Sequence, residues 1–297
     1  MNILCIGNSA YDITSIVEEY PKENYKYRVT DQIECGGGSC GNTAYLLAKW
    51  GLNTYYAGMV GDDYFGKKIR DEFRTIGVKT NYFILNKDFK TTTSQIIINQ
   101  NNGSRTILSY HPDNYQMPDI DIDIVPDIIY LDGREYNMAK KCLEKYPNAL
   151  SIIDAGNDKK EVIELCSMCN YVICSKDFME KVSGIPIINY DTLYNAFNKL
   201  NGMFNTNLIV TLEDKGCAYY DNNEVKIIPS IKVKVKDTTA AGDIFHGAFV
   251  YAISNKFSLI DSLKFSNCAA ALSITRYGGR NSIFDLKDVL EVYNEIK

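Results

Sequence analysis

Seven residues near the C-terminal end, Asp237-Thr238-Thr239-Ala240-Ala241-Gly242-Asp243, come directly before an apolar, helix-like stretch at 244–254. Small residues at the start of a helix leave backbone N–H groups accessible, so a phosphoryl oxygen can approach them and interact with the positive end of the helix dipole. Ala240, Ala241 and Gly242 could form such an anion hole, with Asp243 accepting a proton from an attacking hydroxyl group. The alternative is purely structural, because Thr and Asp also stabilise helix starts without any chemistry.

A second group of small residues lies far upstream. Gly37-Gly38-Ser39-Cys40-Gly41-Asn42 is followed by Gly51 and by Gly61-Asp62-Asp63-Tyr64-Phe65-Gly66. Glycine permits close approach of a ligand to the backbone, and the Asn42 amide offers both a hydrogen-bond donor and an acceptor. Gly36, Gly38 and Gly41 with Asp62 also fit a dinucleotide fingerprint, which would suggest an NAD-dependent oxidoreductase. That motif should follow a buried strand, whereas residues 27–34 alternate with charge like a half-exposed strand, so the NAD hypothesis is disfavoured.

Together, the two groups resemble the signatures of the ribokinase-like (PfkB) carbohydrate kinases, a Gly-Gly-x-x-x-Asn turn followed by Gly-Asp-Asp, and Asp-Thr-x-Gly-Ala-Gly-Asp near the C-terminus. The resemblance spans Ile3 to about Ser282 and implies an ATP-dependent kinase acting on a small polyhydroxylated molecule. Shorter stretches look like the ketohexokinase branch of this family, at residues 19–24, 98–99, 103–108, 133–134 and 175–177. This narrower resemblance would make a ketohexose such as fructose the acceptor. Other sugars, fructosamine-type conjugates and nucleosides stay open, as does a non-catalytic sugar-binding protein.

This resemblance also implies roles for individual residues, with Asp243 as the catalytic base and 240–242 as the anion hole. The residues expected to contact the sugar are Asp12, Gly38, Ser39, Asn42 and Arg105. Those expected to contact the nucleotide are Thr211, Glu213, Gly216, Asn267 and Cys268. Mg²⁺ would be held through water by Asp177 or Glu180. A monovalent cation such as K⁺ would lie near Asp237, Thr239, Gly278 and Ser282.

Several positions depart from the family pattern. Glu213 replaces a glycine of the nucleotide loop, so its side chain must point away from the phosphates. Ala240 replaces the first signature glycine, which is tolerable if its φ is negative. No Lys follows the paired glycines, which disfavours a substrate that is already phosphorylated. Asn24 stands where the ketohexokinase-like pattern has an Asp that reaches the sugar of a neighbouring subunit. His246, one turn after Asp243, is interpreted as packing or facing solvent.

Composition narrows the possible partners and the compartment. The chain of 297 residues carries a net charge of −5 and has no basic cluster, which argues against nucleic acid and anionic membranes as partners. Its cysteines number 9, an odd count that fits reduced thiols better than a disulfide framework. There is no secretory leader pattern and no apolar run of membrane-spanning length, so we expect a cytoplasmic protein.

Short apolar runs alternate with helical segments along the chain, which predicts an α/β protein with a mainly parallel sheet and helices on both faces. Residues 13–34 and 88–110 break this rhythm and contain few helix signals, although Asn102-Gly103 is a hairpin turn pair. We expect them to form a small β-sheet lid on a core of 1–12, 35–87 and 111–297. An isolated small sheet exposes an apolar face and bare edges, so pairing of two lids in a homodimer would cover it.

Overall fold

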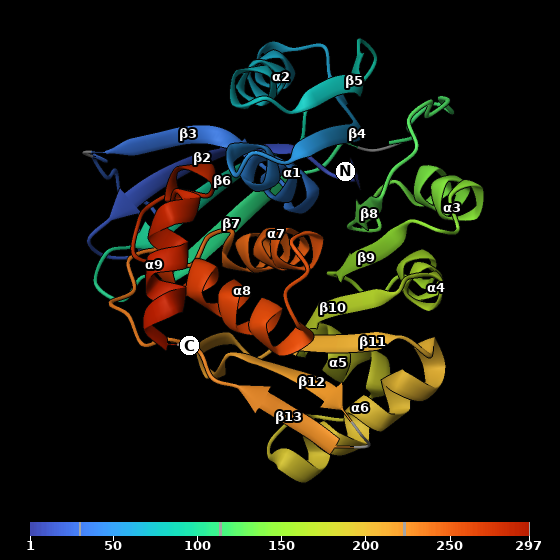
Figure 1. Ribbon diagram of the computed structural model, residues 1–297. Helices are drawn as coiled ribbons and strands as arrows, with labels where there is room; N and C mark the ends of the chain where they lie inside the picture. Colours follow the sequence, from blue (N-terminus) through green and yellow to red (C-terminus); the bar gives the residue numbers. More distant parts are fainter. Residues whose placement is uncertain (30, 113–114, 222–223, 297) are drawn as a thin grey trace.

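A computed structural model describes residues 1–29, 31–112, 115–221 and 224–296. Its main sheet is mostly parallel, with an antiparallel hairpin at one edge (Figure 1). In spatial order its strands are β13 (Glu224–Ile228), β12 (Cys217–Asp221), β11 (Asn207–Thr211), β10 (Tyr171–Ser175), β9 (Leu150–Ala155), β8 (Ile128–Leu131), β1 (Asn2–Ile6), β4 (Asn53–Gly61) and β5 (Lys79–Asn86). The predicted architecture is therefore confirmed.

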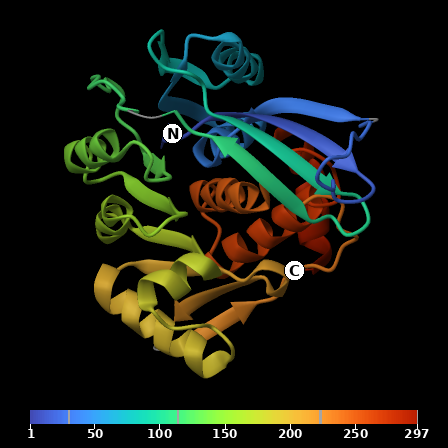
Figure 2. The same cartoon turned by 180° about the vertical axis from the view of Figure 1, so that it is seen from behind.

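Helices cover both faces of this sheet (Figures 1 and 2). One layer contains α1 (Ser39–Lys49), α2 (Tyr64–Ile76), α7 (Ala241–Ser254), α8 (Leu259–Ser273) and α9 (Leu286–Ile296). The other contains α3 (Tyr136–Lys145), α4 (Lys160–Met168), α5 (Lys176–Ser183) and α6 (Tyr190–Phe204). Strand β1 shows why the strands are continuous apolar runs: Ile3 and Cys5 join the core on one face, and Leu4 and Ile6 join the core on the other.

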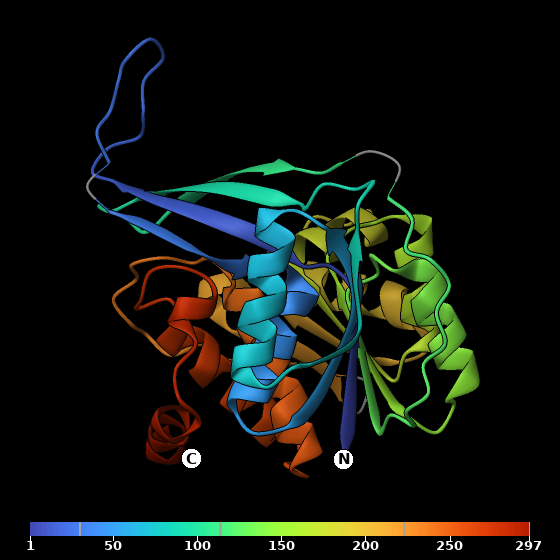
Figure 3. The ribbon, with the colours of Figure 1, turned by 90° about the horizontal axis from the view of Figure 1, so that it is seen from above.

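A second, four-stranded sheet lies over one end of the molecule (Figure 3). Its strands, in order, are β3 (Gln32–Gly37), β2 (Ala10–Val17), β6 (Thr93–Asn99) and β7 (Arg105–Tyr110). It includes residues 10–12 and 35–37, which the sequence analysis assigned to the core, because β2 and β3 pair from Ala10 and Gly37 onward. The exposed segment 18–29, which contains Asn24, extends away from this sheet (Figure 3).

The position of β3 excludes the dinucleotide-binding interpretation of Gly36, Gly38 and Gly41. Strand β3 begins at Gln32, later than the half-exposed strand expected from residue 27, and pairs antiparallel with β2. The glycines thus follow a strand of the small sheet and not a buried strand of a parallel βαβ unit, which the NAD motif requires. Among the described helices, none combines the length and apolarity that crossing a membrane needs.

Candidate active site

Helices α1 and α7 bring the two signature segments together at their N-terminal ends. Asn42, in the first turn of α1, donates a hydrogen bond from Nδ2 to Oδ2 of Asp243 at 2.7 Å. Next to it, the hydroxyl of Thr43 donates to the backbone carbonyl of Asp243 at 3.2 Å. Gly38 precedes α1 with φ 83, and a side chain there would press against the backbone of Ser9 at 2.8 Å. The carboxylate of Asp243 is therefore held at a defined place beside the start of α1.

The residue before α7 has an unusual backbone. Ala240 is in the left-handed region, with φ 61 and ψ 10, so the condition of a negative φ, under which this replacement would be tolerable, is not met. The loop turns sharply here to enter the helix, and the tertiary structure overrides the preference of alanine. The side chain of Ala240 does not cap this helix start, and the N–H of Ala241 makes only a long contact, 3.4 Å, with the carbonyl of Thr238. An anion hole requires N–H groups of this kind, without strong partners, at a helix start. Glu213, the other replaced glycine, is also left-handed at φ 55, and its side chain is exposed.

A third element, β2, brings a second carboxylate to the same place. Asp12 is 6% exposed, and Gly37 lies so close that an added Cβ would overlap the Asp12 carboxylate. A Cβ on Gly279 would lie 3.8 Å from Asp12 Oδ2, 3.7 Å from Asn42 Nδ2 and 3.5 Å from Ala240 Cβ. These three side chains therefore surround one small space in front of Gly279. Three separate segments of the chain converge there.

Arg280, which the sequence analysis missed, supports this arrangement from behind. It is 3% exposed, and its Nη1 forms an ion pair with Glu72 Oε2 at 2.8 Å. Its Nε donates to Oδ1 of Asn42 at 3.4 Å, so a chain of contacts runs from Glu72 through Arg280 and Asn42 to Asp243. Glu72 also accepts the backbone N–H of Gly36 at 3.0 and 2.9 Å, which ties β3 to α2. A single Arg after two glycines belongs to no periodic pattern, so nothing in the sequence indicated that Arg280 contacts Asn42 and Glu72.

Burial sets the protonation of the two carboxylates. Desolvation raises the pKa of Asp243 to about 6; a negative charge on Asp154 adds to this effect when that group is ionised, and the Asn42 hydrogen bond opposes it. Desolvation also raises the pKa of Asp12 to about 6, opposed by the positive charge of Arg280. Both groups are consequently ionised at pH 7. One can accept a proton and the other can accept hydrogen bonds.

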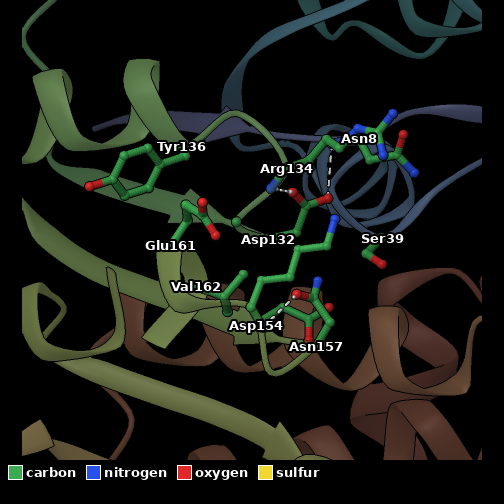
Figure 4. Close-up of a pocket in the computed structure, with 12 residues that line it drawn as sticks. Asn8, Ser39, Asp132, Arg134, Tyr136, Asp154, Asn157, Glu161 and Val162 are labelled. Carbon is green, nitrogen blue, oxygen red and sulfur yellow. Dashed lines mark hydrogen bonds between the residues drawn. The ribbon is translucent and has the colours of Figure 1, made fainter. Parts of the chain in front are cut away.

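A cavity of about 400 Å³ lies at the carboxyl ends of β1, β8 and β9 (Figure 4). Asp132 is at its centre, where Oδ2 accepts the N–H of Asn8 at 2.9 Å and Oδ1 accepts that of Arg134 at 3.0 Å. The Nε of Arg134 is buried and has no hydrogen-bond partner within the described ranges. Other lining residues include Ser39, Asp154, Asn157, Lys159 and Glu161. Asp132 and Asp154 follow buried parallel strands, a signal that could have identified them.

The expected nucleotide contacts are arranged around the end of β11. Thr211 is its last residue, and Gly216 has φ 94 with the carbonyl of Ile228 where a Cβ would be. Asn267 donates from Nδ2 to the carbonyls of Ile228 and Pro229, both at 3.2 Å. Cys268 is 0% exposed and packs in the core. Asn267 thus holds the segment that follows β13, while Cys268 has no surface for a ligand in this conformation.

The expected monovalent-cation residues form a buried, oxygen-rich site. Asp237 is 1% exposed; its two oxygens accept the N–H groups of Thr239 and Gly278, both at 2.8 Å. The hydroxyl of Thr239 is buried without a partner in the described part of the chain, and Ser282 donates to the carbonyl of Gly279 at 2.7 Å. A buried carboxylate beside an unpaired hydroxyl fits a small cation.

The expected Mg²⁺ residues lie on α5 and are engaged by other groups. Asp177 is exposed and forms an ion pair with Lys181 at 2.7 Å. Glu180 accepts the backbone N–H of Ile187 at 2.7 Å. No group of three or more His, Cys, Asp or Glu side chains in the described residues could hold a metal directly.

The small sheet also contacts the signature loop. Arg105, at the start of β7, donates a hydrogen bond from Nη1 to the hydroxyl of Thr238. At the adjacent turn, a Cβ on Gly103 would lie 2.8 Å from a side-chain carbon of Val235. The β6–β7 hairpin therefore rests on the loop that leads into α7.

Comparisons with known proteins identify the family of this chain. The family model described as "pfkB family carbohydrate kinase" matches residues 1–285. The ribokinase of Staphylococcus aureus is 25% identical over 98% of this chain and 99% of its own. Fructokinase-1 of Zea mays is 23% identical over 88% of each chain. The solved structure of Arabidopsis thaliana ribokinase complexed with ribose and ATP has a TM-score of 0.83 and 25% identity, covering 98% of both chains.

The family match covers nearly the whole chain, and the two segments that carried the resemblance meet at Asp243. The chain belongs to the PfkB family of carbohydrate kinases, enzymes that transfer a phosphoryl group to an alcohol group of their substrate.

Proposed function

We propose that this protein transfers the γ-phosphoryl group of ATP to a hydroxyl group of a small sugar, with a ketohexose such as fructose as the favoured acceptor. The observation that carries the proposal is the position of Asp243, in the first turn of an uncapped helix and hydrogen-bonded to Asn42, in front of the buried carboxylate of Asp12. ATP as donor is supported by the solved relative complexed with ribose and ATP. An intact base disfavours a non-catalytic sugar-binding protein.

Each group in the site has a chemical task in this proposal. Asp12 accepts hydrogen bonds from neighbouring hydroxyl groups of the sugar, and Asn42, Gly38 and Ser39 complete its binding site. Asp243, ionised above its pKa of about 6, takes the proton of the attacking hydroxyl. The N–H groups at 240–242 stabilise the charge on the transferred phosphoryl group. Arg105, which already contacts Thr238, supplies a cation from the small sheet.

The remaining residues would hold the nucleotide and ions. Thr211, Gly216 and the backbone at Glu213 border the nucleotide, with Asn267 fixing the segment beyond β13. When bound, Mg²⁺ neutralises phosphate charge and would be held through water by Asp177 or Glu180. Glu180 accepts the Ile187 N–H and Asp177 pairs with Lys181, so these contacts favour neither residue over the other. A monovalent cation such as K⁺ fits beside Asp237 and the unpaired hydroxyl of Thr239.

The small sheet is proposed to close the sugar site and to pair two subunits. Strand β7 is exposed along its length, and its apolar side chains Ile107 and Leu108 are 45% and 58% exposed. The extended segment 18–29 exposes Tyr25 and Tyr27 as well. A second copy would cover these side chains and pair the open sheet edge. Light scattering should then give the mass of a homodimer, and a monomer with full activity would exclude this part of the proposal.

A coupled assay of ADP release, run over ketoses, aldoses, fructosamines and nucleosides with Mg²⁺ and K⁺ present, tests the proposed function. We expect fructose or a related ketohexose to give the highest kcat/KM. Asp243→Asn serves as the control for contaminating kinases. ADP release with nucleosides alone would replace the sugar by a nucleoside in the same site. Binding of sugars without ADP release from any of them would contradict the kinase assignment.

A further inference from the structure

Behind Asp243, α7 places a histidine in the protein interior. His246 follows Asp243 by one helical turn and is 5% exposed. Its Nδ1 lies 3.5 Å from Oδ2 of Asp154, the penultimate residue of β9, which is 9% exposed. Neither ring nitrogen has a hydrogen-bond partner of ordinary geometry within the part of the chain that the structure describes. Buried polar groups are nearly always partnered, so this contact needs a physical explanation.

Asp154 and His246 connect the catalytic base to the cavity of Figure 4. Asp154 lines that cavity, and a negative charge on its carboxyl group would raise the pKa of Asp243. His246 shares a helix face with Asp243 and lies beside the ring of Tyr130, with 6.3 Å between ring centroids. Any charge on the Asp154–His246 pair therefore acts both on the base and on a phosphoryl group held in front of it.

The shifted pKa values of Asp154 and His246 favour one protonation state of this pair at pH 7. Burial, together with the charge of Asp132, raises the pKa of Asp154 to about 8. Burial lowers the pKa of His246 to about 4, against the opposing charge of Asp243. Both directions favour the uncharged forms: a protonated Asp154 whose O–H faces the unprotonated Nδ1 of His246. The single ring proton is then on Nε2.

We propose that Asp154 and His246 are positioning residues, in which the protonated carboxyl of Asp154 donates a hydrogen bond to Nδ1 of His246 and keeps the region behind Asp243 uncharged. The kinetic consequence rests on the proposed kinase function, whereas the protonation state does not. When Asp154 loses its proton, a carboxylate appears beside Asp243 and at the wall of the cavity. This carboxylate repels the incoming phosphoryl group, so turnover falls on the alkaline side.

Other titratable groups face the Asp154–His246 pair, and their titrations must be distinguished from that of Asp154. They are Tyr130 on β8, Asp132 directly after β8, Asp243 on α7, Cys166 on α4, Cys174 on β10 and Lys159 at the cavity wall. Burial keeps both thiols uncharged by raising their pKa values. Glu135 also has a pKa raised by burial to about 8, but it is hydrogen-bonded to Tyr115. Substitution of Asp154 itself is therefore needed to assign an alkaline transition.

The first experiment follows the imidazole directly and needs no enzymatic activity. The chain contains 2 His, so a His111→Gln variant leaves His246 as the sole imidazole. In ¹⁵N-labelled protein, we expect the NMR shifts of this ring to show a neutral Nε2–H tautomer from pH 5 to pH 7.5. The Nδ1 shift should move with a midpoint near pH 8, and Asp154→Asn should abolish that step. Protonation of the ring with the ordinary midpoint of about 6.5, an Nδ1–H tautomer, or no alkaline step would overturn the proposal.

The second experiment compares pH profiles of kcat/KM. With a pKa near 8 on Asp154, the wild-type value should fall by about tenfold between pH 7.5 and pH 9, whereas Asp154→Asn should lose less than about twofold. Ser254→Ala, a buried serine of α7 farther from the site, is the matched control and should keep the wild-type profile. An identical alkaline limb in Asp154→Asn would contradict the role proposed for Asp154. If no variant or wild type phosphorylates any sugar, the kinase assignment fails while the NMR result still decides the protonation state.

Discussion

Asn42 joins the two halves of the active site, because its Nδ2 donates to Oδ2 of Asp243 at 2.7 Å although the residues are 201 positions apart. A hydrogen bond to an ionised carboxylate stabilises the charged form and lowers its pKa. Here it opposes the effect of burial, which would otherwise raise the pKa of Asp243 further. Asn42 therefore has two tasks, since the same amide also lies at the edge of the space in front of Gly279.

Replacement of the base tests the mechanism most directly. Asp243→Asn removes the proton acceptor while keeping the size of the side chain, so kcat should fall by about 10²–10⁴-fold. Nucleotide affinity, measured by isothermal titration calorimetry, should stay within a few-fold because the backbone N–H groups remain. Turnover close to that of the wild type would exclude Asp243 as the general base.

The acid limb of the pH profile should depend on Asn42. The base works when deprotonated, so wild-type kcat/KM should fall as the pH drops through about 6. In Asn42→Ala the stabilising hydrogen bond is lost, the pKa of Asp243 rises, and the limb should move to higher pH. An acid limb that stays at the wild-type position would show that Asn42 binds substrate without influencing the base.

Sugar recognition should depend on Asp12. Asp12→Ala removes a buried acceptor at 6% exposure and should raise the KM for the sugar by tenfold or more, as expected for about 1.5–3 kcal/mol from a charged hydrogen bond. The Kd for ATP should not change. Ser15→Ala, farther along β2, is the control and should leave both constants unaltered. Unchanged sugar kinetics in Asp12→Ala would assign Asp12 a structural role only.

The sequence predicted the parts of the site that depend on local pattern. Gly38, Asn42 and Asp243 lie at helix starts, where small and polar residues have a strong signature, and buried parallel strands such as β1 are visible as apolar runs. The same reasoning failed for the pair Arg280 and Glu72, which meet across 208 positions and belong to no periodic pattern. Long-range charge pairs of this kind depend on the tertiary fold and leave no local trace.

Backbone conformation was the other failure. Alanine prefers negative φ, and Ala240 was expected to be tolerable only in that conformation, yet the loop into α7 imposes φ 61. The strands β5, β12 and β13 were also not predicted. Strands β5 and β13 form the two edges of the main sheet and are partly exposed, and β12 pairs with β13 in the antiparallel hairpin at one of these edges. The fold class could thus be predicted from its central elements, while its edges and its left-handed residues could not.

The buried ion pair should contribute strongly to stability. Glu72→Gln leaves the guanidinium of Arg280, 2% exposed at its side chain, without its carboxylate partner. Removal of one partner from a buried pair typically costs about 3–5 kcal/mol; since Glu72 is 29% exposed, we expect about 2–3 kcal/mol. Urea denaturation would measure the change. Asp71→Asn, which breaks the exposed contact with Arg70, is the control and should cost less than about 1 kcal/mol.

A glycine at position 240 should stabilise the protein. A left-handed conformation costs a non-glycine residue about 1–2 kcal/mol, whereas glycine adopts it freely. Glycine also makes the unfolded chain more flexible, which offsets about 0.4–1 kcal/mol of that gain. Ala240→Gly should therefore raise the free energy of unfolding by about 0.5–1 kcal/mol. Because Ala241 is the first helical residue of α7, Ala241→Gly is a matched control with no left-handed strain to relieve, and it should be destabilising. Urea unfolding curves would measure the free energy of unfolding of both variants. Equal destabilisation by Ala240→Gly and Ala241→Gly would show that position 240 carries no backbone strain.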